Sequence, residues 1–258
     1  MTLVVGILCT DGIVMAADSA SSILAANVKE LTDRKIVACQ QQHLLFGASG
    51  HVGFIDKIHS SISKITSQTK DLEKFRKELQ QKFAEEHRES RKNHVPFPQQ
   101  PNDKPPQADC IVAGYLDKKP FLYNFDVDAT DSDCTLSKFA AVGSGTPFAH
   151  TLFLPHRSNL LNINLDAGKI IANRIICDAI SVTAYGLALP VHVYYMDTQA
   201  HIKMADSAEM SQINITCEAW RRMESDALGN ALTQMKTPTI TVANVDGLPS
   251  MQEKKADK

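Results

Sequence analysis

Thr2 is the residue whose type and position could do chemistry without help from another side chain. A methionine followed by a small residue is a good substrate for methionine removal, which would leave threonine first. The threonine hydroxyl could then attack a carbonyl carbon, and the free α-amine could accept the hydroxyl proton. An α-amine has an ordinary pKa of roughly 7.7–8.0, which suits a general base near neutral pH. The alternative is that Thr2 is an ordinary N-terminal residue.

The cysteines and histidines show no metal-binding pattern. The six cysteines form no C-x-x-C pair, and the nine histidines are scattered without an H-E-x-x-H motif. Gly143 and Gly145 lack the further glycine and the βαβ context of a dinucleotide site. We therefore expect no metal ion and no organic cofactor. Scattered single cysteines are typical of a reducing cytoplasm.

Composition excludes several classes of protein. The chain has 258 residues, of which 43% are hydrophobic and 22% charged, as in a globular protein. Its formal net charge of −2 gives no overall basic field for nucleic acid or an anionic membrane. No apolar run reaches the roughly 18–20 residues of a membrane span. The apolar start lacks the basic region of a signal peptide, so we expect a cytoplasmic protein that binds neither membranes nor nucleic acid.

Strand-like runs occur in pairs between helical stretches. Asp11-Gly12 separates two apolar runs, Thr2–Cys9 and Ile13–Ala17, and is a strong hairpin signal. Further strands are expected at Lys35–Cys39, His43–Ala48, Cys110–Gly114, Phe121–Phe125, Phe139–Val142, Val191–Met196, Ala200–Met204 and, at an edge, Thr239–Ala243. Helices are expected over 55–92 with room for a break at Ser67–Thr69, after Thr146, from Ala167 to about Thr183, and from Ser207.

This order predicts an α+β fold in which two antiparallel sheets pack together with helices outside. We expect a single domain over residues 1–248, followed by a charged tail over 249–258. Five prolines fall between His94 and Gln107, so this stretch is expected to be a loop. With the preceding helix it would form a helical and proline-rich insertion over about 59–107.

A set of motifs then points to a family. The opening from Thr2 to Ser19, with its glycine turn and closing Ala-Asp-Ser, resembles the start of proteasome β-type subunits, which are N-terminal-nucleophile hydrolases. Further similar motifs follow in the same order, at Asp33–Val37, Leu45–Gly50, Val142–Gly145 and Ile176–Ala179. The resemblance covers about residues 2–205. Within the family, the chain is most similar to the bacterial homologue of betaproteobacteria.

The resemblance implies a four-layer αββα sandwich and a threonine endopeptidase. Thr2 would be nucleophile and base, and no propeptide beyond Met1 is expected. Lys35 would lie beside the hydroxyl as a cation, and Asp18 would hold Lys35 charged and oriented. Gly50 would supply a backbone N–H to the oxyanion hole. Ser144 would hydrogen-bond the α-amine.

The same resemblance places further residues near the site. Asp178 and Ser181 are three apart on a helix, so they share a face and could both reach the threonine. Ser22, Asp33 and Ala48 fall where the family lines its first specificity pocket and substrate groove. They suggest a roomy pocket with an acidic wall.

The chain departs from the family pattern at three places. Val182 stands where the family usually has a glycine, and Ala20 where it usually has an arginine. Lys35 lies one residue later than a gapless alignment from Thr2 places it. These departures weaken the case for Ser181 and for local support around residue 20, but they leave Thr2, Asp18 and Lys35 in place.

Relatives enclose their active sites in rings, so the resemblance implies a homo-oligomer, as two stacked rings forming a 14-mer. Its substrates would be peptides and unfolded proteins, and whether an ATPase partner exists is left open. Two alternatives remain at this point. One is a catalytically silent subunit that only forms the ring, and the other is an amidase for small molecules on the same fold.

Overall fold

The computed structural model describes residues 2–23, 28–31, 35–65, 71–95, 104–156, 162–182 and 186–234. Contacts between residues divide the chain into two units, Met1–Glu218 and Ala219–Lys258. Helix α5 (Ser207–Gln234) begins in the first unit and ends in the second. The layers described below belong to the first unit, and a single domain over 1–248 remains a prediction.

The first sheet carries the N-terminal hairpin. Its five antiparallel strands have the order β10-β1-β2-β11-β12. They are β1 (Val4–Leu8), β2 (Gly12–Ala17), β10 (Phe139–Val142), β11 (His192–Asp197) and β12 (Ile202–Met204). Every residue of β1 and β2 is buried, as expected for strands covered on both faces. The hairpin predicted at Asp11-Gly12 is confirmed, with Leu8 opposite Ile13.

The second sheet is also antiparallel and has the order β5-β6-β7-β8-β9. Its strands are β5 (Ile36–Cys39), β6 (Leu44–Gly50), β7 (Ala108–Leu116), β8 (Lys119–Phe125) and β9 (Asp131–Asp133), and the short 3-10 helix η1 (Gln40–Gln42) joins the first two. A separate two-stranded ribbon, β3 (Ala20–Ile23) with β4 (Val28–Leu31), was not predicted.

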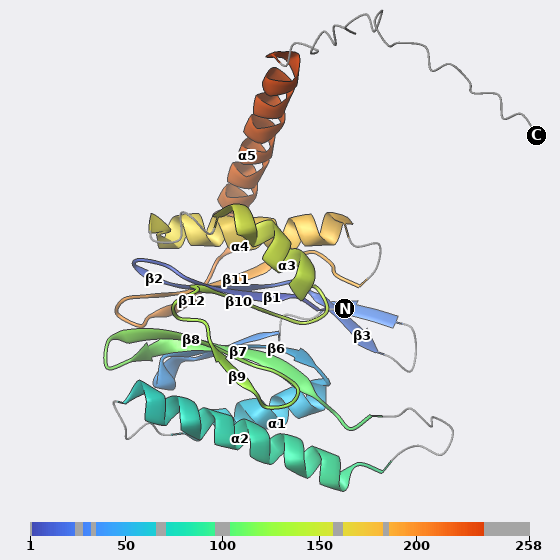
Figure 1. The fold of residues 1–258 in the computed structure, drawn as a ribbon, viewed down its shortest axis with the longest axis vertical. Coiled ribbons are helices and arrows are strands. Elements are labelled where there is room, and N and C mark those ends of the chain that lie inside the picture. The colour runs from blue at the N-terminus through green and yellow to red at the C-terminus, as the bar shows by residue number, and fades with distance from the viewer. Residues whose placement is uncertain are drawn as a thin grey trace, which may run out of the picture. The chain divides into compact units, whose positions relative to one another are not determined.

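Helices cover the outer face of each sheet, which confirms the α+β sandwich (Figure 1). On the first sheet lie α3 (Thr146–Phe153) and α4 (Leu165–Val182), and on the second lie α1 (Val52–Ile62) and α2 (Leu72–Asn93). Among the described helices, none combines the length and the apolar character needed to cross a membrane.

Side-chain alternation along the strands builds two apolar layers. On β6, Leu45 packs with Val4 and Met15 between the two sheets. Its neighbour Phe46 packs on the opposite face, together with Phe54 of α1 and other side chains of α1 and α2. Successive side chains of a strand point to opposite faces, so one strand serves both layers. The site described below lies at one end of the layer between the sheets, where β1 begins.

The helix predicted over 55–92 is two helices. α1 already begins at Val52, and α2 has a new start at Asp71, whose carboxylate accepts the backbone N–H groups of Glu73 (2.9 Å) and Lys74 (3.4 Å). An aspartate in this N-cap position favours starting a helix. The predicted break at Ser67–Thr69, most of the proline-rich loop, the edge strand at 239–243 and the tail at 249–258 lie outside the described residues.

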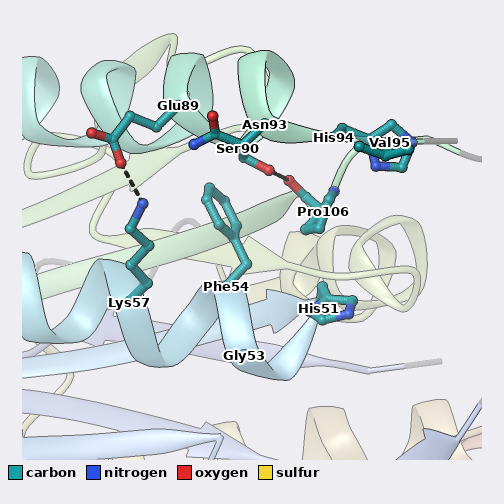
Figure 2. Close-up of a pocket in the computed structure, with 10 residues that line it drawn as sticks. All are labelled: His51, Gly53, Phe54, Lys57, Glu89, Ser90, Asn93, His94, Val95 and Pro106. Carbon is teal, nitrogen blue, oxygen red and sulfur yellow. Dashed lines mark hydrogen bonds and ion pairs between the residues drawn. The ribbon is translucent and has the colours of Figure 1, made fainter.

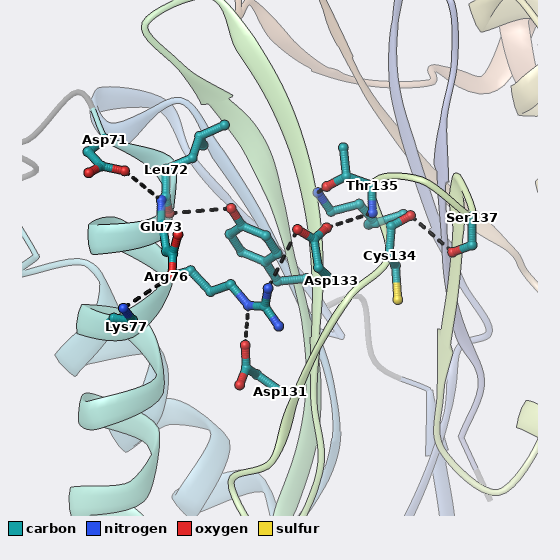
Figure 3. Close-up of polar contacts among 12 residues, drawn as sticks. Asp71, Leu72, Glu73, Arg76, Lys77, Asp131, Asp133, Cys134, Thr135 and Ser137 are labelled. Atoms are coloured by element: carbon teal, nitrogen blue, oxygen red, sulfur yellow. Dashed lines mark hydrogen bonds and ion pairs between the residues drawn. The ribbon is translucent and has the colours of Figure 1, made fainter.

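A polar cluster ties α2 to the second sheet (Figure 3). The Arg76 guanidinium donates to the Asp131 carboxylate and lies 3.6 Å from that of Asp133, both on β9. It also lies 5.6 Å from the centre of the Tyr123 ring on β8. These contacts hold the edge of the sheet against the helix, since one cation satisfies two carboxylates from the last strand.

We expect Arg76→Ala to lower the free energy of unfolding by about 1–2 kcal/mol, because the largely buried Asp131 carboxylate loses its cation. Lys77→Ala is the matched control on the same helix. Its ion pair with Glu73 is exposed, so its loss should cost under about 0.5 kcal/mol. Urea unfolding at one protein concentration measures both, and equal losses would contradict this account of the cluster.

Candidate functional site

Asp18 forms the centre of the candidate site. It follows β2 directly, and its side chain is fully buried. One carboxylate oxygen, Oδ1, accepts the Leu3 backbone N–H at 2.9 Å and the Lys35 ammonium at 2.7 Å. The other, Oδ2, accepts the backbone N–H groups of Ala20 at 3.0 Å and Ala188 at 3.3 Å. A buried carboxylate is stable only with such partners, so Asp18 fixes four chain segments around one point.

Lys35 faces Asp18 from the start of β5 on the second sheet. Its side chain is 8% exposed, so the ion pair with Asp18 is largely withdrawn from water. Burial, the largest effect, lowers the pKa of Lys35, while the charge and hydrogen bond of Asp18 act in the opposite direction. The ion pair predicted from the resemblance is therefore present, and it joins the two sheets at one end.

The backbone of Thr2 is held next to this ion pair by hydrogen bonds. Its N–H donates to the Ser144 hydroxyl oxygen at 3.3 Å, and its carbonyl oxygen accepts the Gly145 N–H at 3.2 Å. Gly143 has φ +97°, and a Cβ there would lie 2.3 Å from the Thr2 carbonyl oxygen. The turn after β10 can therefore approach Thr2 only with glycine at this position. The turn at residues 143–145 and the hydrogen bond from the Leu3 N–H to Asp18 together fix the position of the Thr2 nitrogen.

Gly50 ends β6 with φ +142°, and a Cβ there would lie 2.2 Å from the Gln107 carbonyl oxygen. Along β6, the Ala48 N–H donates to the Lys35 carbonyl oxygen, and the His51 N–H donates to Gln107 on the opposite side. Backbone N–H groups alternate sides along a strand, so the Gly50 N–H points to the side of Lys35. This orientation fits a donor that faces the site.

Asp178 and Ser181 lie on α4 and share a face, as predicted. The Asp178 carboxylate pairs with Arg174 at 3.2 Å, one turn earlier, and the Ser181 hydroxyl donates to the Asp178 carbonyl oxygen at 2.7 Å. These bonds stay within the helix. That the Asp178 and Ser181 side chains reach Thr2 remains a prediction.

The three predicted pocket residues have different positions. Ala48 is 2% exposed and packs in the layer beneath α1 and α2. Ser22 lies in β3 by its backbone, and its side chain is outside the described part of the chain, as is all of Asp33. Sequence reasoning missed Ser49, whose hydroxyl oxygen lies 3.0 Å from where a Cβ of Gly143 would be. The end of β6 therefore lies close to the turn that holds Thr2.

A separate cavity of about 340 Å³ opens between α1 and α2 (Figure 2). Phe54 reaches up from α1 toward α2, and the Lys57 ammonium pairs with the Glu89 carboxylate at 2.5 Å. The Ser90 hydroxyl donates to the Pro106 carbonyl oxygen at 2.8 Å. Polar groups of this lining thus have partners within the chain. Within the described residues, no three His, Cys, Asp or Glu side chains form a group that could hold a metal ion.

Comparison with known proteins gives both a family and a fold. The sequence model of the family described as proteasome subunit matches residues 2–187. No curated protein sequence matches the chain.

The solved structures that superpose include Anbu proteins. The Anbu Gly-1 mutant from Hyphomicrobium sp. strain MC1 has a TM-score of 0.68 at 14% identity, covering 92% of this chain and 98% of that one. Anbu from Yersinia bercovieri, described as an ancestral beta-subunit, has a TM-score of 0.65 at 12% identity, with 91% and 98% covered. At these identities the similarity is one of fold, so membership of the betaproteobacterial subgroup remains a prediction.

The match over residues 2–187 includes Thr2, Asp18, Lys35, Gly50 and Ser144, which the structure places at one end of the two packed sheets. The ordered motifs in the sequence led to the same family. The chain belongs to the proteasome subunit family.

Proposed function

We propose that the protein is a threonine endopeptidase subunit of a proteasome-like ring, with Thr2 as its nucleophile once Met1 is removed. One observation carries the proposal. The Thr2 nitrogen donates to Ser144, while the next backbone N–H and the Lys35 ammonium share one oxygen of buried Asp18. Once Met1 is removed, the Thr2 α-amine would lie beside the Ser144 hydroxyl and near this ion pair.

The first half-reaction forms an ester. The Thr2 hydroxyl oxygen bonds to the carbonyl carbon of a peptide, and its proton passes to the α-amine, directly or through a water. The carbonyl oxygen becomes negatively charged and accepts the Gly50 N–H. The C–N bond then breaks, and the departing amine takes the proton. The acyl part of the substrate remains on Thr2.

The second half-reaction restores the enzyme. A water gives a proton to the α-amine, and its oxygen bonds to the ester carbon. The Thr2 oxygen leaves with that proton, and the carboxylic acid is released. One residue thus acts as base and acid in turn, which requires that its nitrogen be an amine and not an amide.

Lys35 and Asp18 would act on the nucleophile by charge. A positive ammonium favours the deprotonated form of a nearby hydroxyl. Because burial lowers the pKa of Lys35, the ammonium needs the adjacent Asp18 carboxylate to keep its proton. Asp178 and Ser181 are proposed to support the α-amine, and Ser22, Asp33 and Ala48 to line the substrate groove, as the family pattern implies.

We further propose that the subunits assemble as stacked rings in the cytoplasm, which would admit peptides and unfolded chains to enclosed sites. Membership of the proteasome subunit family supports assembly.

The test is hydrolysis of peptides blocked at both ends, with products identified by mass spectrometry. We expect cleavage of internal peptide bonds. Cleavage of small amides alone would favour an amidase, and a purified assembly that cleaves nothing would favour a silent subunit. Either result would overturn the proposal.

A further inference from the structure

The segment from Gly186 to Pro190 precedes β11 and runs beside Asp18 and Ser19, the two residues that follow β2. β11 pairs with β2 so that His192 lies opposite Ala17. Continuing this antiparallel register places Pro190 opposite Ser19. Proline has no backbone N–H, so the regular ladder cannot continue through this position.

Hydrogen bonds from the side chain and the backbone of Ser19 take the place of the ladder bonds that end at Pro190. The Ser19 hydroxyl donates to the Pro190 carbonyl oxygen, and the Ser19 N–H donates to the Ala188 carbonyl oxygen at 2.9 Å. Ser19 is 1% exposed, so these bonds are shielded from water. The two bonds fix the segment at Ala188 and Pro190, on either side of Leu189.

The same segment supplies one of the four donors to Asp18. The Ala188 N–H donates to Oδ2, on the opposite side of the carboxylate from Lys35. Because the two oxygens belong to one rigid plane, a donor on Oδ2 also sets how Oδ1 faces the ammonium. The position of Ala188 therefore bears on the ion pair. The backbone N–H of Ser19 holds Ala188 itself, and the Ser19 hydroxyl holds Pro190, two residues further along the same segment.

We propose that Ser19 is a positioning residue, which holds the 186–190 segment so that its Ala188 N–H orients the Asp18 carboxylate toward Lys35. This inference rests on the proposed peptidase function. Ser19 acts through Asp18 and touches no reacting atom. Its effect is accordingly on the rate of the chemical step and not on substrate binding.

The first test is the kinetics of Ser19→Ala on a peptide substrate. We expect kcat to fall roughly 3- to 10-fold with KM unchanged, the size of effect that loss of one hydrogen bond gives. The alkaline limb of the pH profile should move to lower pH, because Lys35 then keeps its proton less well. Ser19→Thr, which keeps the hydroxyl, should retain most of the wild-type kcat.

Ser137→Ala is the matched control. Its hydroxyl also donates to backbone carbonyl oxygens, those of Cys134 (3.1 Å) and Phe139 (3.2 Å). It precedes β10 at the end of β1 that is remote from Thr2. Equal loss of kcat in Ser137→Ala, or equal loss in Ser19→Ala and Ser19→Thr, would overturn the proposal.

Hydrogen exchange gives a second measurement that needs no activity. A fragment spanning residues 187–191 should exchange faster in Ser19→Ala than in the wild type, at unchanged global stability. Unchanged exchange would overturn the inference. A wild-type protein that cleaves no peptide would instead overturn the proposed function, so the two failures are distinguishable.

Discussion

Replacement of Thr2 by alanine should abolish peptide hydrolysis and leave the fold intact. The bonds that position this residue come from its backbone N–H and carbonyl oxygen, which alanine retains. The substitution thus removes the nucleophile alone. Loss of a nucleophile lowers kcat by several powers of ten, so we expect at least about a 1,000-fold decrease. Steady-state hydrolysis of a fluorogenic peptide measures it.

Thr2→Ser is the control for this prediction. Serine keeps the hydroxyl and the α-amine, and it is small enough to allow methionine removal. It should therefore retain measurable activity with the same products. A Thr2→Ala protein that hydrolyses peptides at the wild-type rate would exclude Thr2 as the nucleophile.

Asp18→Asn should have the largest effect on stability, lowering the free energy of unfolding by about 3–5 kcal/mol. The carboxylate accepts four donors on two oxygens, whereas an amide offers one oxygen and an NH₂ group that is itself a donor. At least one pair of donors loses its acceptor, and the buried Lys35 loses its counter-charge. Chemical unfolding at fixed protein concentration measures the loss, and peptide hydrolysis should also fail.

The double variant Asp18→Asn with Lys35→Met separates the two causes. It removes the unpaired buried ammonium, so part of the lost stability should return. Activity should not return, because neither charge is restored. Asp18→Asn with wild-type stability would contradict the description of Asp18 as the buried centre of the site.

The arrangement of strands could be predicted where local chemistry determines it. Asp11-Gly12 indicates its hairpin, and Gly12 is required there because a Cβ would lie 2.3 Å from the Met196 carbonyl oxygen on the neighbouring strand. The periodic apolar positions over 55–92 gave the covering helices and left room for a break at Ser67–Thr69, between the end of α1 and the start of α2. Ile58, Ile62 and Phe75 all pack on the same sheet face, so the pattern continues across the interruption.

The site could be predicted only in part. The ordered motifs indicated Thr2, Asp18, Lys35, Gly50 and Ser144. The structure brings Thr2, Asp18, Lys35 and Ser144 together and places Gly50 at the end of β6. The ribbon β3–β4 was missed because its strands are only four residues each. The bond from Ala188 to Asp18 joins residues 170 positions apart, and no local pattern signals such a contact. Its only trace in the sequence is Pro190, which ends the ladder beside Ser19.

The intact mass of the purified protein tests the central claim most directly. The mechanism needs the Thr2 nitrogen to be a free amine, so the account predicts the mass of a chain that begins at Thr2. A mass that retains Met1 would contradict it. The nitrogen would then be an amide that cannot accept the hydroxyl proton, and a silent ring subunit would become the better description.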